Sequence, residues 1–386
     1  MKRLAGITLA ATLVCVCASV AMGAGVKYKN EDGDYVKLGG RIQLQYHLQD
    51  PEDGDSTDAL LFRRFRPYIE GSVHEDWKGK FQFDLGKSDV AVKDAYFHYS
   101  GLDGIGVTIG NANFCFSREL LTSSKYQQLV ERTFVGDHNY GTPDRQAGIH
   151  LNGELADGML AWNVAAAKGA IDPSNKKLDF DTVIQFDAGD DWLEGNMYGG
   201  RLELFPMGAF KHSQGDFSGD LKAALGVAAF AWENDDDHVN MDTDEDTGVS
   251  TVSAEDVDSV SGVEVSGALR VAGLSVDAQY NTFDAELVNG EAGSDGIYKD
   301  GETTLENFAV EGGYMVVPSR VELVAGYQSQ DADGYAETWN RTSVGANFFV
   351  AKHDIKYQVT YRMGENKDGK DGNDVNELFV QAQYVF

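Results

Sequence analysis

Residues 354–363 read Asp-Ile-Lys-Tyr-Gln-Val-Thr-Tyr-Arg-Met, and every second one is apolar. A strand sends alternate side chains to opposite faces, so this stretch has one apolar and one polar face. The same alternation occurs at 41–48 and 274–281. A helical pattern of comparable strength occurs only near 117–130. The dominant period of two therefore predicts an all-β protein.

Strand-like stretches follow one another along the whole chain. We count sixteen, at 36–48, 60–74, 77–85, 90–100, 105–111, 144–155, 158–168, 196–205, 220–234, 260–271, 273–284, 303–315, 319–329, 339–350, 353–363 and 374–386. The connections after even-numbered strands are short, apart from 206–219, and most connections after odd-numbered strands are long. Short turns on one rim and long loops on the other are typical of outer-membrane barrels.

The strand lengths also fit a membrane. Strands of roughly ten residues suit a tilted crossing of the bilayer, and closure pairs every backbone group. The last strand carries Leu378, Val380, Ala382, Tyr384 and Phe386 on one face, and an alternating strand with a terminal Phe is typical of bacterial outer-membrane proteins. We therefore predict a sixteen-stranded antiparallel transmembrane β-barrel in the bacterial outer membrane, surrounded by its lipid. A barrel of this size leaves an aqueous channel.

The first residues have the pattern of a secretory leader. Lys2 and Arg3 precede an apolar run, and the small-residue site 21–23 predicts cleavage before Ala24. We expect residues 1–23 to be a signal peptide and 24–386 to be the barrel domain. An uncleaved membrane anchor is the alternative. Two of the three Cys lie in this leader, so Cys115 alone follows it, which excludes a disulfide framework.

The formal net charge of the chain is −30, and its distribution is uneven. Loops 50–58, 235–259, 284–302 and 331–337 together hold 24 acidic residues and 1 basic residue. The lumen-facing positions are near neutral, with basic side chains concentrated in the first three strands. Nucleic acid is excluded as a partner because it requires a basic surface. The sharper interpretation of the lumen is a basic face that an anion follows; the plainer one is charges that pair and support the wall.

Residues 60–134 contain, in this order, Phe62-Arg63-Arg64-Phe65-Arg66, Lys93-Asp94-Ala95-Tyr96, Ile109-Gly110-Asn111, 120–125 and Val130-Glu131-Arg132. In the order and spacing of these motifs, residues 60–134 resemble the phosphate-selective porin O and P family. The resemblance implies a homotrimeric, sixteen-stranded channel whose long third loop, 112–143, folds into the lumen. It also implies passive diffusion of small anions such as phosphate.

The resemblance points to particular residues. It places Arg63 and Arg64 in an arginine cluster at the constriction, and Asp94, Ser124 and Lys125 in the anion-coordinating group. Alternation and position alone add Arg66, Tyr96, Arg118 and Arg132. We expect Arg64 and Lys125 to set anion preference despite the acidic loops, because rim charges are screened beyond about 8–10 Å.

Other functions are disfavoured by missing motifs. No nucleophile motif, metalloprotease His-Glu pair, phosphate-cradling Gly loop or Cys cluster is present, so we expect neither an enzyme nor a cofactor. Asp242, Asp244 and Asp246 have calcium-loop spacing, but Gly248 is one place late and position twelve is Ser253, so we expect no metal site. Two alternatives stay open: a secreted all-β binding protein, and a general or cation-favouring porin on the same barrel, which the acidic loops favour.

Overall fold

The structure is a computed structural model that describes most of the chain. It covers residues 25–86, 90–171, 176–181, 195–234, 240–243, 248, 250–254, 256–288 and 296–386. The expected signal peptide, 1–23, lies outside the described residues, and so does most of the 235–259 loop with its calcium-like spacing. Among the described helices, none is long and apolar enough to cross a membrane.

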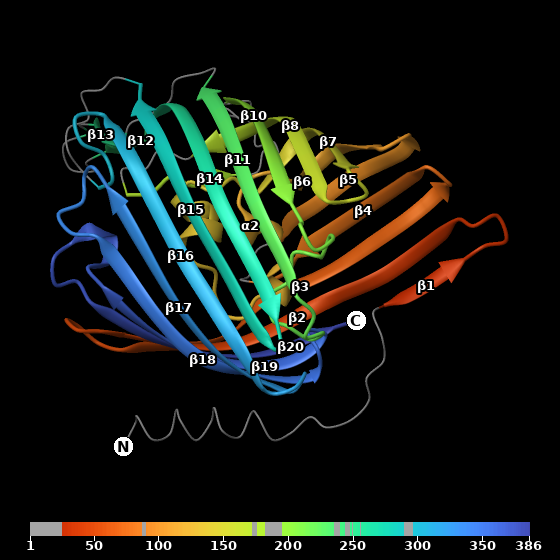
Figure 1. The fold of residues 1–386 in the computed structure, drawn as a ribbon. Helices are drawn as coiled ribbons and strands as arrows, with labels where there is room; N and C mark the ends of the chain where they lie inside the picture. Colours follow the sequence, from red (N-terminus) through yellow and green to blue (C-terminus); the bar gives the residue numbers. More distant parts are fainter. Residues whose placement is uncertain are drawn as a thin grey trace.

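Sixteen strands of one antiparallel sheet close into a barrel (Figure 1). They are β2 (Tyr35–Pro51), β3 (Thr57–His74), β4 (Trp77–Asp84), β5 (Ala91–Leu102), β6 (Ile105–Asn113), β7 (Arg145–Leu155), β8 (Leu160–Ile171), β10 (Gly195–Leu204), β11 (Lys222–Asn234), β14 (Val257–Val271), β15 (Leu274–Leu287), β16 (Glu302–Val317), β17 (Val321–Ala332), β18 (Trp339–Ala351), β19 (Ile355–Glu365) and β20 (Val375–Val385). The first of them, β2, pairs with the last, β20, which closes the sheet. The predicted all-β barrel and its strand count are confirmed.

The structure also has short strands and helical turns outside the sixteen barrel strands. Strand β1 (Val26–Lys29) pairs with the start of β2, β9 (Phe180–Asp181) pairs with β8, and β12 (Asn240–Thr243) pairs with β13 (Ser250–Ala254). The helical pattern near 117–130 gives only α2 (Arg118–Leu121) and the 3-10 turn η1 (Ser124–Tyr126). The stretch forms no longer helix, because its backbone groups make hydrogen bonds to side chains of the barrel wall in place of helical ones.

The two faces of the wall differ in polarity. On β11, Leu225 and Val227 face outward and keep half or more of their exposure, while Ala224 and Ala228 face inward and are buried. Tyr198, Tyr314, Tyr327 and Tyr384 are also exposed on the outer face. An apolar outside with interspersed aromatic residues is the surface that hydrocarbon and headgroups require.

The seam of the barrel is held by the last residue. Phe386 donates a backbone hydrogen bond to Gly40 O (2.9 Å) and accepts one from Gly40 N (2.8 Å). Its ring lies so close to Gly40 that a Cβ there would be 2.8 Å from Phe386 Cζ. The residue therefore extends the β2–β20 pairing beyond the strand itself.

We expect deletion of Phe386 to lower the amount of folded barrel in the membrane, because the seam loses both hydrogen bonds and the stacked Tyr384–Phe386 pair (5.9 Å). Heat-modifiable gel migration of membrane fractions measures this amount. A Phe386→Tyr variant keeps the backbone and the ring, and should insert normally. Equal folded yields for the deletion and the full chain would contradict the expectation.

Part of the lumen is filled by an apolar cluster. Inward-facing Phe230 of β11 and Phe283 of β15 pack with Phe114 and Phe116, which follow β6. The Phe116 and Phe230 rings meet edge to face at 4.9 Å. This cluster fills the lumen beside β11 and β15 and holds the start of the long loop against the wall.

Candidate functional site

Residues 114–144, here called the constriction segment, lie against the inner face of the wall; its helix α2 is drawn inside the barrel in Figure 1. Lys356 Nζ of β19 donates to Gln127 O (2.8 Å), and Thr360 Oγ1 accepts from Val130 N (3.3 Å). Further bonds join the segment to β15, β17 and β18. The polar side chains that accept and donate these bonds are the inward-facing ones of each strand. The segment therefore occupies the lumen beside β15–β19.

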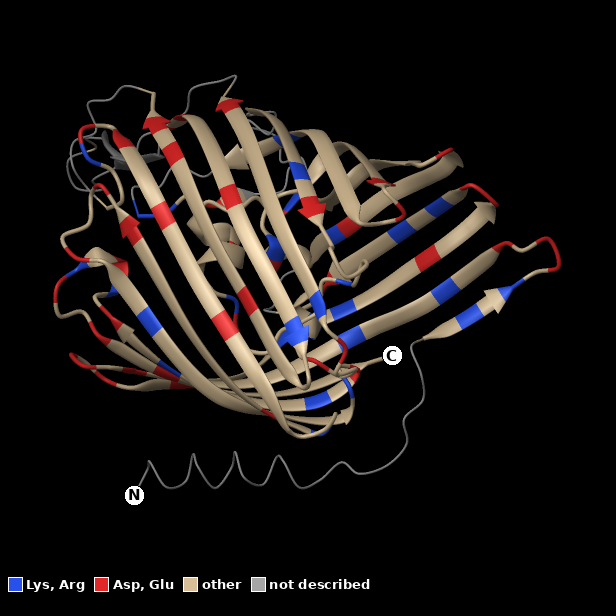
Figure 2. Ribbon diagram, in the orientation of Figure 1, with Lys and Arg blue, Asp and Glu red and all other residues tan. Residues whose placement is uncertain are grey.

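A cavity of about 810 Å³ remains between the constriction segment and strands β2–β8. Its lining includes eight cationic side chains: Lys37, Arg41, Arg66, Lys78, Lys80, Lys125, Arg132 and Arg145. The acidic side chains in the lining are Glu70 and Asp94. Figure 2 shows blue Lys and Arg bands along β2–β4, and red acidic positions along other strands and in the turns and loops at the rims. The open part of the lumen therefore has a basic wall.

Two β-bulges direct cations toward the constriction segment, behind this wall. Along the β2–β3 pairing, Gln43 faces Arg64 and Leu44 faces Phe62, so Arg63 is an extra residue. Along β4–β5, Gln82 faces Asp94 and Phe83 faces Val92, so Lys93 is extra. A bulge re-aims the side chain of its extra residue. Strict alternation would send Arg63 and Lys93 outward, but both bond to groups of the constriction segment.

Arg63 and Arg64 are joined to the constriction segment through Glu131. Arg63 Nε and a terminal nitrogen donate to the two Glu131 oxygens, at 2.7 and 3.0 Å. Arg64 lies 3.8 Å from the same carboxylate and donates to Gln43 Oε1 (3.2 Å). The two guanidinium groups hold the pKa of the Glu131 carboxyl well below its usual range, against the opposing effect of burial. This pair of arginines therefore tethers the segment and does not line the cavity.

Five cations of the cavity are without a carboxylate partner in the described part of the chain: Lys37, Arg41, Lys78, Lys125 and Arg132. Arg41 donates to Ser123 Oγ (3.0 Å), and its buried Nε has no bonding partner. Arg132 donates to three backbone carbonyls, and its Nε is likewise unpartnered. Lys125 lies over the Tyr126 ring (4.8 Å), and burial next to Arg41 lowers its pKa. Beside them, the buried Ser124 hydroxyl also lacks a bonding partner.

The other three cations of the cavity, Arg66, Lys80 and Arg145, are paired with carboxylates. Asp94 accepts from Arg145 Nε (2.6 Å) and Lys80 Nζ (2.5 Å), and Arg66 donates to Asp84 Oδ2 (2.6 Å). Arg145 also bonds Asp144 (2.8 Å), whose pKa it holds well below the usual range. Tyr96 lines the cavity next to this network. The three cations and three carboxylates of this network balance, so the positive charge of the cavity comes from the cations without a carboxylate partner.

The sequence-predicted site residues fall into three places. Arg66, Asp94, Tyr96, Ser124, Lys125 and Arg132 line one cavity. Arg63 and Arg64 lie behind it. Arg118 is separate, because it is buried with Glu203 and Asp277 (3.5 Å to Asp277) beside the ring of Phe210. The structure does not bring Arg118 to the basic wall.

Sequence reasoning did not assign Arg41, Lys93 or Arg145 to the site. The alternation of β2 was a sufficient signal for Arg41. The direction of the Lys93 side chain is set by a bulge. Arg145 is the first residue of β7, and alternation does not fix the direction of a side chain at the end of a strand. Only the folded geometry brings both to Asp144.

Comparisons with known proteins agree with this architecture. Residues 36–189 match the phosphate-selective porin O and P family. Porin O of Pseudomonas aeruginosa is 29% identical over 178 residues, which are 42% of this chain and 38% of Porin O. The match thus spans less than half of that relative. Residues 36–189 contain the strands of the basic wall and the whole constriction segment. The resemblance to the porin O and P family that the sequence motifs indicated is therefore confirmed.

Solved structures extend the likeness to the remaining strands. The anion-selective porin from Comamonas acidovorans has a TM-score of 0.61 at 12% identity, with 92% of this chain and all of that chain (100%) covered. The trimer form of OmpT from Vibrio cholerae has a TM-score of 0.57 at 18% identity, with 92% of this chain and 100% of that chain covered. These neighbours share the fold. With the porin O and P match, the barrel places the chain in the bacterial outer membrane.

Proposed function

We propose that the chain forms a water-filled channel for passive diffusion of small anions, in particular phosphate-like oxyanions. The observation that carries this proposal is the composition of the cavity wall, with eight cationic and two acidic side chains. A narrow passage lined by one sign of charge concentrates ions of the opposite sign and lowers their energy of entry.

The unpartnered donors supply the chemistry for an oxyanion. Arg41, Lys125 and Arg132 offer N–H groups that replace part of the anion's hydration, and the Ser124 hydroxyl is free to donate a hydrogen bond. Bonds from charged donors to oxyanions are stronger than neutral ones. Asp94 has a different role in this proposal, since both of its oxygens already bond to cations and it orients Lys80 and Arg145.

A general or cation-favouring porin is the second candidate, and the acidic loops favour it. The four long loops hold 24 acidic residues against 1 basic residue. Their field attracts cations to the mouth, yet it decays over about 8 Å at physiological ionic strength. The charges nearest the permeating ion act through less solvent and are screened less. We therefore rank the basic wall above the acidic rim.

We also propose that the channel functions as a homotrimer in outer-membrane lipid. The support is the family match and a trimeric porin among the structures of the same fold. The apolar outer face of the barrel can take either lipid or a neighbouring copy. Cross-linking of the purified protein, or its mass in detergent, measures the oligomeric state.

Reversal-potential measurement on single purified channels in a potassium chloride gradient tests the proposal. We expect the potential to have the sign of an anion-selective channel, and millimolar inorganic phosphate to reduce the chloride current. Raising the salt to 1 M shortens the screening length to about 3 Å, so we expect preference to weaken there. A cation-selective reversal potential that collapses first in high salt would favour the acidic rim instead.

A further inference from the structure

The turn between β10 and β11, residues 205–221, is here called the inner turn. Its ends lie at the short-turn rim, where Phe205 N donates to Met159 O (2.7 Å) and Ala272 N to Gly219 O (3.0 Å). Its middle enters the lumen: Gln214 is buried and the Phe217 ring packs on Phe349 at 4.9 Å. The other described connections at this rim are short. The inner turn is longer than they are, and its additional residues lie inside the barrel.

Gln214 joins the inner turn to the constriction segment. Its backbone N donates to Tyr126 O (3.0 Å), and its Oε1 accepts from Gln128 N (2.6 Å). Its Nε2 donates to Glu311 Oε2 of β16 (2.6 Å), and its carbonyl accepts from His353 Nε2 (2.8 Å). One residue thus connects the segment to two parts of the wall.

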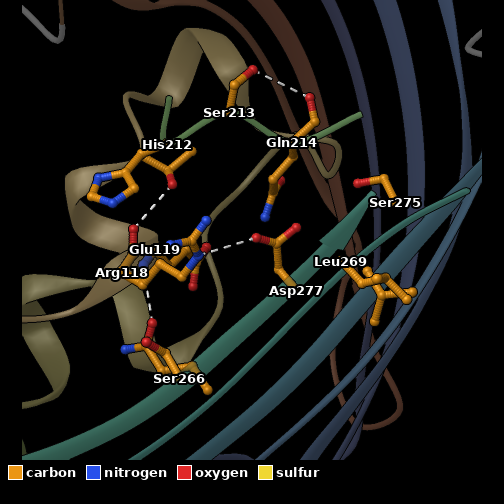
Figure 3. Close-up of polar contacts among 12 residues, drawn as sticks. Arg118, Glu119, His212, Ser213, Gln214, Ser266, Leu269, Ser275 and Asp277 are labelled. Carbon is orange, nitrogen blue, oxygen red and sulfur yellow. Dashed lines mark hydrogen bonds and ion pairs between the residues drawn. The ribbon is translucent and has the colours of Figure 1, made fainter. Parts of the chain in front are cut away.

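The inner turn is also fixed to the wall without Gln214. Arg270 donates to Ser213 O (2.8 Å), Ser275 Oγ accepts from Gly215 N (3.0 Å), and Asp216 Oδ2 accepts from Gly273 N (2.8 Å). Figure 3 shows His212 and Gln214 next to Arg118 and Glu119 of α2 and Asp277 of β15, while the Ser213 hydroxyl points toward the Gln214 carbonyl. The turn is therefore anchored on its own and can support a neighbouring segment.

The supported residues are those that shape the cavity. Ser124 and Lys125 form η1 together with Tyr126, whose carbonyl bonds to Gln214. Gln128, two residues beyond η1, reaches Glu322 Oε1 (2.7 Å) because Gly313 leaves room; a Cβ there would lie 2.1 Å from Gln128 Nε2. The position of Ser124 and Lys125 therefore depends on bonds made within three residues of them.

We infer that the inner turn is a fixed brace that sets the width of the anion path, with Gln214 as its positioning residue. This inference rests on the proposed anion channel and adds what holds its narrow part. Without the Gln214 carboxamide, the backbone N–H of Gln128 is buried without an acceptor. The constriction segment then becomes more mobile at Lys125, which faces the cavity.

The variant Gln214→Met tests this role, because it keeps the length of the side chain and removes both of its hydrogen bonds. We expect normal heat-modifiable barrel, increased noise of the open-channel current and a several-fold weaker block of chloride current by phosphate. Met207→Ala is the matched control in the same turn, since Met207 is exposed and should leave all three readouts unchanged.

The outcomes separate the two proposals. Suppose that the wild-type channel is anion-selective and that Gln214→Met has the same current noise and the same phosphate block as the wild type. The brace is then refuted, while the proposed channel function stands. If the wild-type channel is cation-selective, the proposed function fails whatever the variant does.

Hydrogen exchange on the wild-type protein gives a test that needs no variant. The amides of Gln128 and Gln214 both donate to acceptors inside the lumen. We expect peptides covering 124–130 and 210–216 to be protected to a similar degree, and far more than the turn 156–159. Exchange of 210–216 as fast as that of 156–159 would overturn the inference.

Discussion

Replacement of both Lys125 and Arg132 by alanine is expected to weaken strongly the anion preference of the channel and its block by phosphate. Both side chains line the cavity, and no carboxylate lies within bonding distance of either in the described residues. A unit charge about 4 Å from an ion contributes about 1 kcal/mol in water. Two such charges give about 2 kcal/mol, or up to about 30-fold in the ratio of anion to cation permeability.

The control for this double variant is Lys370→Ala, which removes an exposed lysine of the loop before β20. Reversal potentials of both variants in the same salt gradient provide the comparison. Anion preference that survives in the double variant but is lost in Lys370→Ala would show that charge at the rim controls permeation, and the cation-favouring alternative would gain support.

Arg64 is expected to matter less for selectivity than its sequence position indicates. Strand alternation correctly directs it into the lumen, and the family motif places it at a constriction. In the fold, however, Arg64 is 5% exposed and bonds to Gln43, with Glu131 between it and the open cavity. Alternation gives the face of the sheet on which a residue lies. It does not give the loop residue that covers it.

The barrel itself follows from local patterns, and for that reason the sequence predicts it well. Each strand needs only its own alternation, such as that of 354–363, and each rim needs only the lengths of its connections. The constriction segment is different. Its course is set by single contacts with residues far away in sequence, such as Lys356 with Gln127 or Gln328 with Phe134.

Bulges and the inner turn escape sequence reasoning for related reasons. A bulge shifts one residue of the register and leaves the hydrophobic pattern on both sides intact, so Arg63 is an outward position by counting and an inward one in the fold. The inner turn is visible in the sequence only as a longer connection at the short rim. Its inward course depends on a donor in β14 and acceptors in β15 and β16.

The second large effect is expected at Glu131. Its carboxylate holds Arg63 at 2.7 Å while the two side chains keep 15% and 22% of their exposure. Removing one partner of a buried pair costs about 3–5 kcal/mol, and the partial exposure places this pair at the low end, at about 3 kcal/mol. Glu131→Gln removes the charge with little change in shape. It should loosen the constriction segment and leave two uncompensated guanidinium groups behind the cavity.

We therefore expect Glu131→Gln to be more anion-selective than the wild-type channel and to have a noisier open state. Single-channel recording measures both properties, and Glu337→Gln, at an exposed loop position, is the charge-matched control. A variant that folds and retains wild-type selectivity and noise would show that Glu131 does not hold the segment.

The pH dependence of the wild-type channel should also depend on the ion pairs of Glu131 with Arg63 and Arg64. Because Arg63 and Arg64 hold the pKa of Glu131 below its usual range, its contribution is fully present above the ordinary Glu pKa of about 4.3. It is lost only as the pH falls from there through the lower pKa of the folded state. The contribution of Glu131 to noise and selectivity should thus be constant from pH 8 to about 5, and it should be lost in stronger acid. The variant lacks the titrating carboxyl, so its own change over the acidic range should be smaller; equal pH responses in the two channels would assign the acid sensitivity to another group.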